Sequence, residues 1–359
     1  MKCRGLLLAS LAKLTHAHSL SQQMVTMMRA NPQVLIKALP DDKLTPDHYE
    51  LVEGTIHDPE AGEVLVETSA FAITAGTRAG LQGSASYAGA PKTGIVMNGT
   101  GVGRVVASQD PAFKEGDAVL GPTGWQQFSL HQGSALQLID PADDPIHYLG
   151  PLGVNGLTAY FGLFNVGAPV AGETVMVSAA AGSVGHLVGQ MARVHGCQVV
   201  GVAGSDAKNQ ELVSRLGFHQ AVNYKSPDFR ALLKEATPNG VDVYFDNTGG
   251  AVLGAALFRL NVNGRIACCG VVSQYDTSRP EPGPKGIPGL LVNKRITMRG
   301  FLVFDFALEY ASARETIRGW LASGDLVSLT DEVSGLDAAP RAFVDLLAGG
   351  NIGTRVVRL

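Results

Sequence analysis

The stretch Val175-Met-Val-Ser-Ala-Ala-Ala-Gly182-Ser-Val-Gly185-His-Leu-Val-Gly189 has the pattern of a strand that passes through a tight turn into a helix. It begins with a short run of β-branched and apolar residues and then crosses a group of small residues. Apolar side chains follow at helical spacing, at Val184, Leu187, Val188, Met191 and Val194. We therefore predict a buried strand, a turn and an amphipathic helix here.

The turn reads Ala180-x-Gly182-x-x-Gly185, a dinucleotide-binding fingerprint with alanine in the first glycine position. Gly182 would let the backbone approach a pyrophosphate, and Gly185 would let the helix pack closely on the strand. The helix N-terminus would add unpaired N–H groups and a positive dipole end. Small residues also occur at turns that bind nothing, so the motif alone favours phosphate binding only slightly.

The next predicted strand starts at Cys197 and ends in Ala203-Gly204-Ser205-Asp206-Ala-Lys208. An NAD site usually has a carboxylate at the end of this strand, about 20 residues past the fingerprint, for the ribose 2′-hydroxyl. Here Ala203 and Gly204 stand in that place and a lysine lies nearby, which favours a 2′-phosphate and therefore NADPH over NADH. Asp206 could take the NAD role, but Ser205-Asp206 before a helical pattern is typical of an N-cap and a first-turn acid. Lys208 could also be an ordinary surface lysine.

Composition limits the classes of protein to which the chain can belong. With 359 residues, 45% of them hydrophobic and 17% charged, the chain is long enough for two globular domains. A net charge of −4 and the lack of a basic run argue against a nucleic-acid partner. The sequence contains no transmembrane helix.

The four cysteines do not form a metal-binding pattern. Cys268 and Cys269 are neighbours in a predicted strand, so their side chains point to opposite faces and cannot ligate one metal together. The sequence has no C-x-x-C motif and no His/Cys cluster, so we expect no metal site. Reduced, buried thiols fit a cytoplasmic protein.

The N-terminal segment has a different composition from the rest. It carries Lys2 and Arg4, then a short apolar run, and has no acidic residue before Asp41. A signal peptide or an organelle-targeting segment would explain this pattern, but Lys13 interrupts the apolar run. We favour a poorly ordered extension over residues 1–30, or a start codon downstream of Met1.

The hydrophobic pattern changes character along the chain. Short β-rich runs separated by Gly, Pro and Asp turns extend from Val34 to about Leu138 and predict a β-rich module. From Leu157 strands alternate with helices, and six strands with crossover helices predict a doubly wound parallel sheet. A helix from Glu309 to Leu321 and a strand starting at Thr354 are expected to return to the first module. The predicted fold is α/β, with a Rossmann domain inserted into a β-rich domain.

These motifs together resemble the zinc-free branch of the medium-chain dehydrogenase/reductases, near prostaglandin reductases, bacterial curcumin reductase and plant double-bond reductases. The resemblance covers roughly residues 31–359. The matching motifs are Gly153-Val-Asn-Gly-Leu-Thr-Ala-Tyr-Phe-Gly162, Ala179-Ala-Ala-Gly-Ser-Val-Gly185, Asp246-Asn-Thr-Gly-Gly250, Cys269-Gly-Val-Val-Ser-Gln-Tyr275, Arg299-Gly-Phe-Leu-Val303 and Gly350-Asn351-Ile-Gly353.

The resemblance implies a GroES-like substrate domain over residues 31–150, a Rossmann NADPH domain over 151–303, and a return to the first domain over 304–359. It also implies a homodimer and NADPH-dependent reduction of the carbon–carbon double bond of α,β-unsaturated ketones or aldehydes. The cofactor-binding residues that it implies are Gly182, Ser183, Val184, Gly185, Ser205, Lys208, Tyr224, Asn247, Cys269, Gly270, Val271, Ser273, Tyr275, Phe301, Leu302, Val303 and Asn351. Taken singly, Tyr224, Asn247 and Asn351 could be ordinary strand and turn residues.

The sequence also departs from the family pattern. Family members carry Asp-Pro-Tyr-Met-Arg where this chain reads Ala75-Gly76-Thr77-Arg78, so a substrate-side tyrosine is missing. Tyr87 matches a second family tyrosine that lines the pocket. Zinc-dependent relatives have a Gly-His-Glu near the place of Met97-Asn98-Gly99, so a zinc ligand is absent and alcohol dehydrogenase chemistry is not expected.

The expected reaction builds negative charge on the substrate carbonyl oxygen and needs a donor there. Tyr275 is the first choice, because a tyrosine with a pKa near 10 is a neutral donor at neutral pH; a tyrosine that only packs against the ligand is nearly as good an explanation. Residues 276–289, rich in proline, are expected to form an irregular loop at the substrate entrance. Two alternatives remain, namely a zinc-free NADPH:quinone reductase and a non-catalytic NADPH-binding protein.

Overall fold

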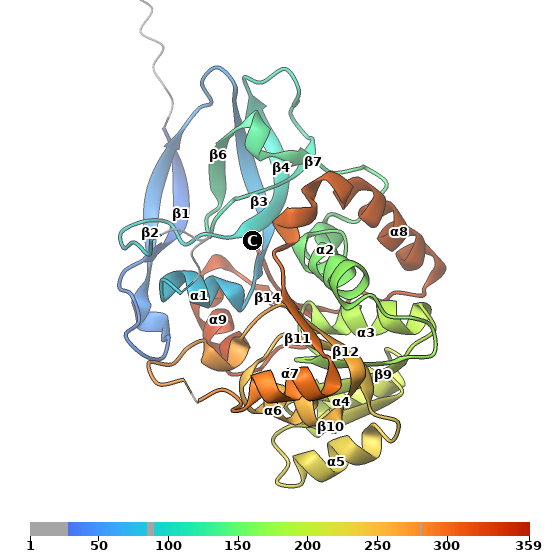
Figure 1. Ribbon diagram of the computed structural model, residues 1–359. Coiled ribbons are helices and arrows are strands. Elements are labelled where there is room, and N and C mark those ends of the chain that lie inside the picture. Colours follow the sequence, from blue (N-terminus) through green and yellow to red (C-terminus); the bar gives the residue numbers. More distant parts are fainter. Residues whose placement is uncertain (1–27, 85–89, 281) are drawn as a thin grey trace, which may run out of the picture.

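A computed structural model describes residues 28–84, 90–280 and 282–359 of the protein. Figure 1 shows a β-rich part, coloured blue to teal, above an α/β part coloured green to orange. The last segment of the chain, in red, runs back between them. The α/β prediction is confirmed. The numerical domain limits, residues 31–150, 151–303 and 304–359, stay a prediction.

The α/β part is built on a six-stranded sheet in which every neighbouring pair is parallel. The strand order β10-β9-β8-β11-β12-β13 changes direction at β8, as in a doubly wound fold. Parallel strands in such a sheet are covered on both faces, and β8 and β11 are accordingly buried along almost their whole length. The strands are β8 (Thr174–Ser178), β9 (Gln198–Ala203), β10 (Gln220–Asn223), β11 (Val241–Asp246), β12 (Leu260–Cys268) and β13 (Thr297–Gly300).

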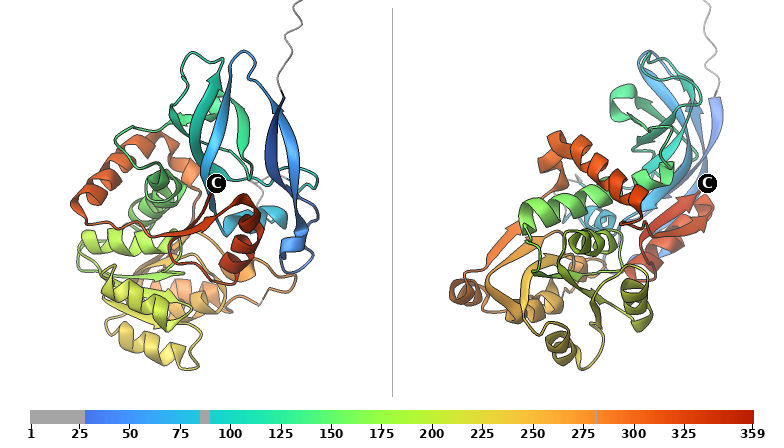
Figure 2. Two further views of the ribbon diagram at one scale, coloured as in Figure 1. Left: turned by 180° about the vertical axis from the view of Figure 1, so that it is seen from behind. Right: turned by 90° about the vertical axis from the view of Figure 1, so that its right-hand side faces the viewer.

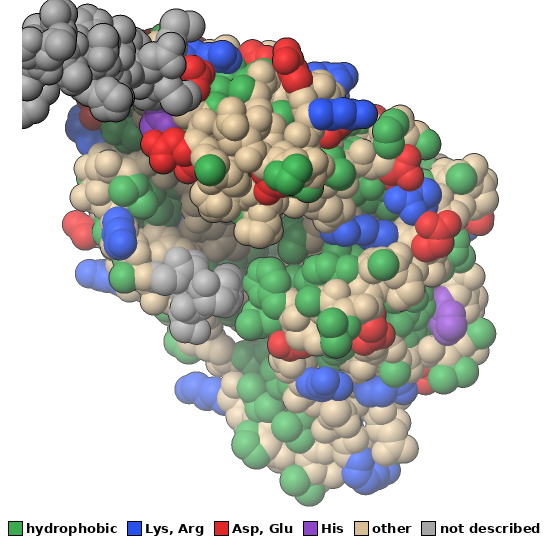
Figure 3. Space-filling model, turned by 90° about the horizontal axis from the view of Figure 1, so that it is seen from above, with side chains coloured by type: hydrophobic (Ala, Val, Ile, Leu, Met, Phe, Trp, Pro, Cys, Tyr) green, Lys and Arg blue, Asp and Glu red, His purple; other side chains and the backbone are tan. Residues whose placement is uncertain are grey.

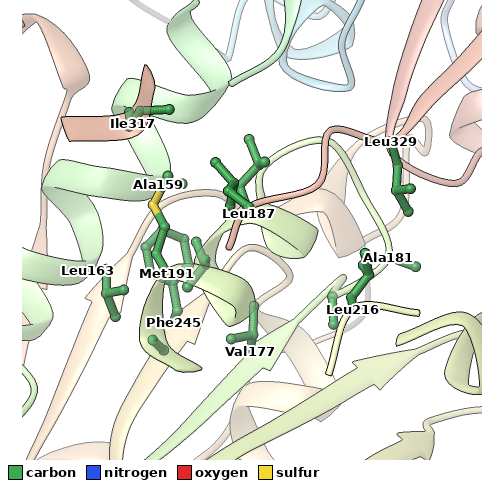
Figure 4. Packing of buried hydrophobic residues seen from close by; sticks show 14 of the residues in the cluster. Ala159, Leu163, Val177, Ala181, Leu187, Met191, Leu216, Phe245, Ile317 and Leu329 are labelled. Atoms are coloured by element: carbon green, nitrogen blue, oxygen red, sulfur yellow. The ribbon is translucent and has the colours of Figure 1, made fainter. Parts of the chain in front are cut away.

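Helices cover both faces of this sheet, which Figure 2 shows from behind and from the side. They are α2 (Val154–Phe161), α3 (Gly185–Val194), α4 (Asp206–Ser214), α5 (Phe229–Ala236), α6 (Gly250–Arg259) and α7 (Ile287–Lys294), with a π-helical extension of α2 over Gly162–Gly167. Helix α3 buries Leu187, Val188 and Met191 at the spacing expected from the sequence. Figure 4 shows Leu187 and Met191 in one cluster with Val177 of β8 and Phe245 of β11.

The β-rich part has a sheet of the order β14-β15-β3-β4-β5-β7, with β6 paired to β3. Strands from the two ends of the chain meet there, because β15 pairs antiparallel with β3 and parallel with β14. The strands are β3 (Glu63–Ile73), β4 (Thr100–Ser108), β5 (Ala118–Gly121), β6 (Phe128–Gln132), β7 (Gln137–Leu138), β14 (Thr330–Ser334) and β15 (Thr354–Arg358). The C-terminal segment thus completes the sheet of the first module.

A separate hairpin of β1 (Met28–Ile36) and β2 (Tyr49–His57) packs beside this sheet. Trp125 joins the hairpin to the rest, because its ring stacks on Tyr49 and Phe71 and lies against Phe343. The hairpin also corrects the limit of the expected extension, since residues 28–30 are paired in β1 with residues 55–57. Residues 1–27 lie outside the described part of the chain.

Three further helices lie at the junction and the edge of the β-rich part: α1 (Gly76–Leu81), α8 (Tyr310–Ser323) and α9 (Ala339–Leu347). Helix α8 lies close to the one predicted from Glu309 to Leu321. The irregular loop predicted over residues 276–289 ends early, because Ile287 and Pro288 begin α7. Proline fits the first helical turn, where its missing N–H has no intrahelical partner in any case.

Candidate active site

A cavity of about 510 Å³ lies where the fingerprint turn faces the β-rich part. Figure 3 shows hydrophobic side chains grouped around a hollow on the upper face, with positive and negative side chains interspersed around it. Predicted cofactor residues that line the cavity are Gly182, Ser183, Val184, Gly185, Ser205, Lys208, Tyr224, Asn247, Cys269, Gly270, Tyr275 and Asn351. Twelve of the residues implied by the resemblance therefore line one cavity, and their role in binding a cofactor stays a prediction.

The fingerprint turn is held against both parts of the protein. A Cβ built on Gly185 would lie 2.3 Å from the Ala179 carbonyl oxygen, so helix α3 approaches β8 at a distance that only glycine permits. Gly182 forms an isolated bridge with Gly353, and the Gly353 N–H donates to the Ala181 carbonyl at 2.8 Å. The segment after Asn351 thus supports the fingerprint turn through backbone contacts.

A buried histidine adds a second connection to this turn. His186 is fully buried, and its Nδ1 lies 2.8 Å from the Gly182 carbonyl, while its Nε2 lies 3.2 Å from the Leu329 N–H. The first contact needs a donor and the second an acceptor, so the ring is the neutral tautomer protonated on Nδ1. Burial lowers the pKa of His186 to about 4. Protonation of Nε2 would place a second N–H against the Leu329 N–H and break the connection.

We expect the protein to lose stability between pH 6.5 and pH 4 because of His186. In this window the unfolded histidine, with a pKa of 6.5, binds a proton that the folded one, with a pKa of about 4, does not. Stability is therefore complete above pH 6.5 and falls as the pH decreases, by up to about 3 kcal/mol. Urea unfolding at pH 7.5 and pH 4.5 should show this loss in the parent and a smaller one in His186→Gln. Equal losses in both proteins would contradict the assignment.

Two lysines and a tyrosine gather at the carboxyl ends of β9 and β10. Lys208 donates from Nζ to the Gly349 carbonyl at 2.8 Å, and Lys225 lies near the Tyr224 ring. Burial, together with the charge of Lys225, lowers the pKa of Lys208. An anion bound between these ammonium groups would reduce their mutual repulsion. The 2′-phosphate expected from the sequence is an anion of this kind. Lys225 did not figure in the sequence prediction, although it is the last residue of the Asn-Tyr-Lys motif.

The structure decides between the two roles considered for Ser205 and Asp206. Ser205 is the N-cap of α4, and its hydroxyl accepts from the Lys208 N–H. Asp206 does not line the 510 Å³ cavity; it accepts a hydrogen bond from the side chain of Asn223 and borders a separate, more open hollow. The alternative in which Asp206 binds the ribose of NAD is therefore not supported.

The other end of the cavity is formed by the turns after β11 and β12. The Asp246 carboxylate accepts from the Thr248 and Gly249 N–H groups, and Asn247 donates from its side chain to the Ser178 carbonyl at 2.8 Å. The Tyr275 hydroxyl reaches back over this turn, because a Cβ built on Gly270 would lie 3.9 Å from it. The Tyr275 hydroxyl therefore lies at this end of the cavity. Burial raises the pKa of the neighbouring Cys269 thiol.

Some residues implied by the resemblance lie away from the cavity lining. Val271 and Ser273 pack against the Gly249-Gly250 turn, and Val272 lines the cavity instead. Phe301 packs on Phe245, Val303 is buried beside Phe161, and Leu302 is largely exposed. These five residues remain a prediction that a cofactor-bound structure would have to test. Tyr87 lies outside the described residues.

A smaller cavity of about 260 Å³ adjoins the first and shares Thr74, Val154 and Asn155 with it. Its polar lining comes from Thr77, Asn98, Thr100 and Tyr148, all on the β-rich side or the segment that follows it. Thr77 and Asn98 lie at the two places where the sequence departs from the family pattern, and Val154 and Asn155 lie in a matching motif, but the sequence did not show that these segments meet. Only the folded chain brings them together.

No metal centre is evident in the part of the chain that the structure describes. Over residues 28–84, 90–280 and 282–359, no three or more His, Cys, Asp or Glu side chains are grouped so as to hold a metal ion. The described residues also include no helix long and apolar enough to cross a bilayer.

Comparison with known proteins gives the same assignment over most of the chain. A family model described as the N-terminal domain of oxidoreductase matches residues 32–139, and one described as zinc-binding dehydrogenase matches residues 183–318. The 2-alkenal reductase (NADP(+)-dependent) of Nicotiana tabacum is 44% identical over 277 residues, 76% of this chain and 80% of that protein. The NADPH-dependent curcumin reductase of Escherichia coli is 36% identical, over 92% of this chain and 97% of that protein.

The solved structures agree with the sequence relatives. The crystal structure of CurA from Vibrio vulnificus in complex with NADPH has a TM-score of 0.87 and 35% identity. The match covers 91% of this chain and 98% of CurA. The chain therefore belongs to the medium-chain dehydrogenase/reductase family, in the zinc-free branch that contains the alkenal, curcumin and prostaglandin reductases.

Proposed function

We propose that the protein reduces the carbon–carbon double bond of α,β-unsaturated ketones or aldehydes with NADPH. The observation that carries this proposal is the cavity itself, which has a pair of lysines at one end and the Tyr275 hydroxyl at the other. Relatives at 44% and 36% identity are named for NADP- or NADPH-dependent reduction of an alkenal and of curcumin. The lining fits this nucleotide, because glycine backbone, a helix N-terminus and paired cations occur along one continuous surface.

Different groups of lining residues would bind different parts of the dinucleotide. Ser183 and Val184, with the N-terminal N–H groups of α3, would hold the pyrophosphate. Lys208, Lys225 and Tyr224 would hold the 2′-phosphate end. The turn around Asn247 and Gly270 would hold the nicotinamide end, and the bound dinucleotide supplies the hydride.

The substrate would bind in the smaller cavity, which adjoins the nicotinamide end of the main cavity. Its carbonyl oxygen would accept a hydrogen bond from the Tyr275 hydroxyl, which would stabilise the negative charge that develops on that oxygen. Thr74 and Asn155 line both cavities and place the substrate between them. The neighbouring apolar residue Val154 helps to exclude water from the reacting carbons.

A comparison of acceptors tests the proposal. NADPH oxidation at 340 nm would be followed with medium-chain 2-alkenals, aryl enones, oxo-lipids and quinones, each also with NADH. We expect the largest kcat/KM for an enone or enal with NADPH. A larger value for quinones would replace the proposal by quinone reduction. Binding of NADPH without oxidation by any acceptor would replace it by a non-catalytic role.

We propose a homodimer that forms through β13. This strand is the edge of the six-stranded sheet, and all four of its residues are exposed. Met298 in the strand, Leu302 and Phe304 shortly after it and Val292 in the preceding helix α7 are exposed apolar side chains. An unpaired edge strand beside apolar side chains is a template for pairing with another chain, here a second copy.

Negative charge introduced on this surface is expected to convert the dimer into monomers. Leu302→Asp combined with Phe304→Asp should halve the mass measured by light scattering after size exclusion, because each protomer would bury two carboxylates in the interface. Leu51→Asp is the control, since Leu51 is equally exposed but lies on β2. An unchanged mass of the double variant, or a parent that is already monomeric, would refute this interface.

We place the protein in the cytoplasm, in keeping with the free thiols of Cys197, Cys268 and Cys269. A targeting role for the N-terminal segment would be tested by comparing the location of the full chain with that of a variant starting at Met24. Transport of the full chain alone into an organelle would contradict the cytoplasmic assignment.

A further inference from the structure

A buried arginine connects the β-rich part to the loop that carries Tyr275. Arg78 of α1 is 1% exposed, and its Nε donates to the Asp276 carboxylate at 3.0 Å. The two residues are 198 positions apart, and Asp276 directly follows Tyr275 in the chain. The ion pair therefore links two opposite walls of the cavity, since α1 begins at Gly76, which lines it, and Tyr275 lines it from the other side.

Further hydrogen bonds extend this link over three consecutive residues. The same Asp276 oxygen accepts from the Leu44 N–H at 2.6 Å, and Arg78 donates from Nη2 to the Asp42 carbonyl. The Asp42 carboxylate accepts from the Ser278 N–H at 2.6 Å, and Gln82, the C-cap of α1, donates to the Thr277 carbonyl at 3.4 Å. We call Asp42, Arg78 and Asp276 the clasp. It holds residues 276–278 against the β-rich part.

The backbone of Asp276 indicates that the clasp determines the conformation there. Its φ is +58°, in the left-handed region that side chains other than glycine, asparagine and aspartate rarely adopt. A residue stays in such a conformation when its surroundings over-determine it. The surroundings are the buried guanidinium, which needs a negative partner because an unpaired charge is costly to bury, and the Leu44 N–H.

We propose that Arg78 is a positioning residue for Tyr275, acting through Asp276. The clasp fixes the backbone immediately after Tyr275, and so fixes where the phenolic hydroxyl lies relative to Gly270 and the smaller cavity. It also sets the separation of the two walls between which the substrate binds. This inference rests on the proposed role of Tyr275 as the donor to the substrate oxygen.

Activity measurements in two backgrounds test the positioning role. Arg78→Met should lower kcat by about 10- to 100-fold, because a displacement of about 1 Å at a reacting group costs that much. In the Tyr275→Phe background the same substitution should change kcat less than about twofold, since the group that it positions is absent. NADPH affinity should stay unchanged, because Arg78 does not line the cavity. An equal fall of kcat in both backgrounds would overturn the proposal.

Variants at Asp276 separate the ion pair from the backbone conformation. Asp276→Gly keeps the left-handed conformation accessible but removes the acceptor, and should reproduce Arg78→Met. Asp276→Asn keeps an acceptor and the tolerance for positive φ but loses the charge that the buried guanidinium needs, so its kcat should lie between those of Asp276→Gly and the parent. Arg265→Met is the matched control for losing an ion pair, since Arg265 pairs with Glu173 outside the cavity lining. Its kcat should equal that of the parent.

Limited proteolysis reports on the clasp independently of catalysis. Lys285 is exposed in the loop that the clasp holds, so trypsin should cleave after it faster in Arg78→Met and Asp276→Gly than in the parent or Arg265→Met. If these two variants are cleaved faster but Tyr275→Phe has the kcat of the parent, the clasp exists and the proposed role of Tyr275 is wrong. Unchanged cleavage in both variants would overturn the clasp itself.

Discussion

Replacing Tyr275 by phenylalanine is expected to lower kcat for an enone by about 100- to 1000-fold. The Tyr275 hydroxyl lies close to Gly270, at the nicotinamide end of the cavity proposed above. Among the described residues of the turn after β12 that line the cavity, no other has a side-chain hydroxyl. Loss of one preorganised donor to a developing oxyanion typically removes about 3–4 kcal/mol of transition-state stabilisation. The dissociation constant of NADPH, measured by fluorescence titration, should change little, because the ring is kept.

Tyr310→Phe is the matched control for this experiment. Tyr310 lies in α8 and contacts Phe161, away from both cavities. Loss of the Tyr310 hydroxyl should leave kcat unchanged. If Tyr275→Phe turned over as fast as the parent, Tyr275 would be a packing residue, which is the alternative that the sequence left open.

Replacing Lys208 by alanine is expected to raise the KM for NADPH by about 10- to 100-fold and to leave the KM for NADH unchanged. A hydrogen bond to a charged group contributes about 1.5–3 kcal/mol, and only the phosphorylated cofactor offers a dianion here. The Gly349 carbonyl already holds the Lys208 ammonium at the cavity, so little side-chain freedom is lost on binding. The ratio of the two kcat/KM values measures the effect.

Lys234 supplies the control for Lys208. It is an exposed lysine of α5 that lines neither the main nor the smaller cavity. Lys234→Ala should leave both KM values as they are. A parallel rise of the KM for NADPH and NADH in Lys208→Ala would mean that the lysine supports α4 and does not recognise the phosphate.

The parts of the fold that the sequence predicted are those governed by local rules. The strand, turn and helix around Gly182 were predicted because small residues, β-branched residues and helical spacing occur within one continuous stretch. The role of Gly185 followed from the same stretch and appears in the structure as its close approach to Ala179. Ser205 was identified as an N-cap because that preference depends only on the residues that follow it.

The parts that were missed depend on residues far apart in the sequence. Strand β2 was not predicted, because its residues become a strand through pairing with β1 and packing of Tyr49 on Trp125. The smaller cavity combines residues of β3, β4 and α2 with those of separate turns, and no spacing in the sequence shows that these segments meet. The Arg78–Asp276 pair spans 198 residues, so only the folded chain brings the two charges together.

The bridge between Gly182 and Gly353 has a consequence for how the molecule can be divided. The dinucleotide turn takes part of its support from the final segment, through Ala181 and through Leu329, which meets His186. A fragment ending near residue 303 would lack both partners and would leave a buried imidazole nitrogen without its donor. The β-rich part and the α/β part are therefore expected to unfold in a single calorimetric transition. Because they unfold together, bound nucleotide should stabilise the distant β1–β2 hairpin as well as the fingerprint turn that the nucleotide contacts.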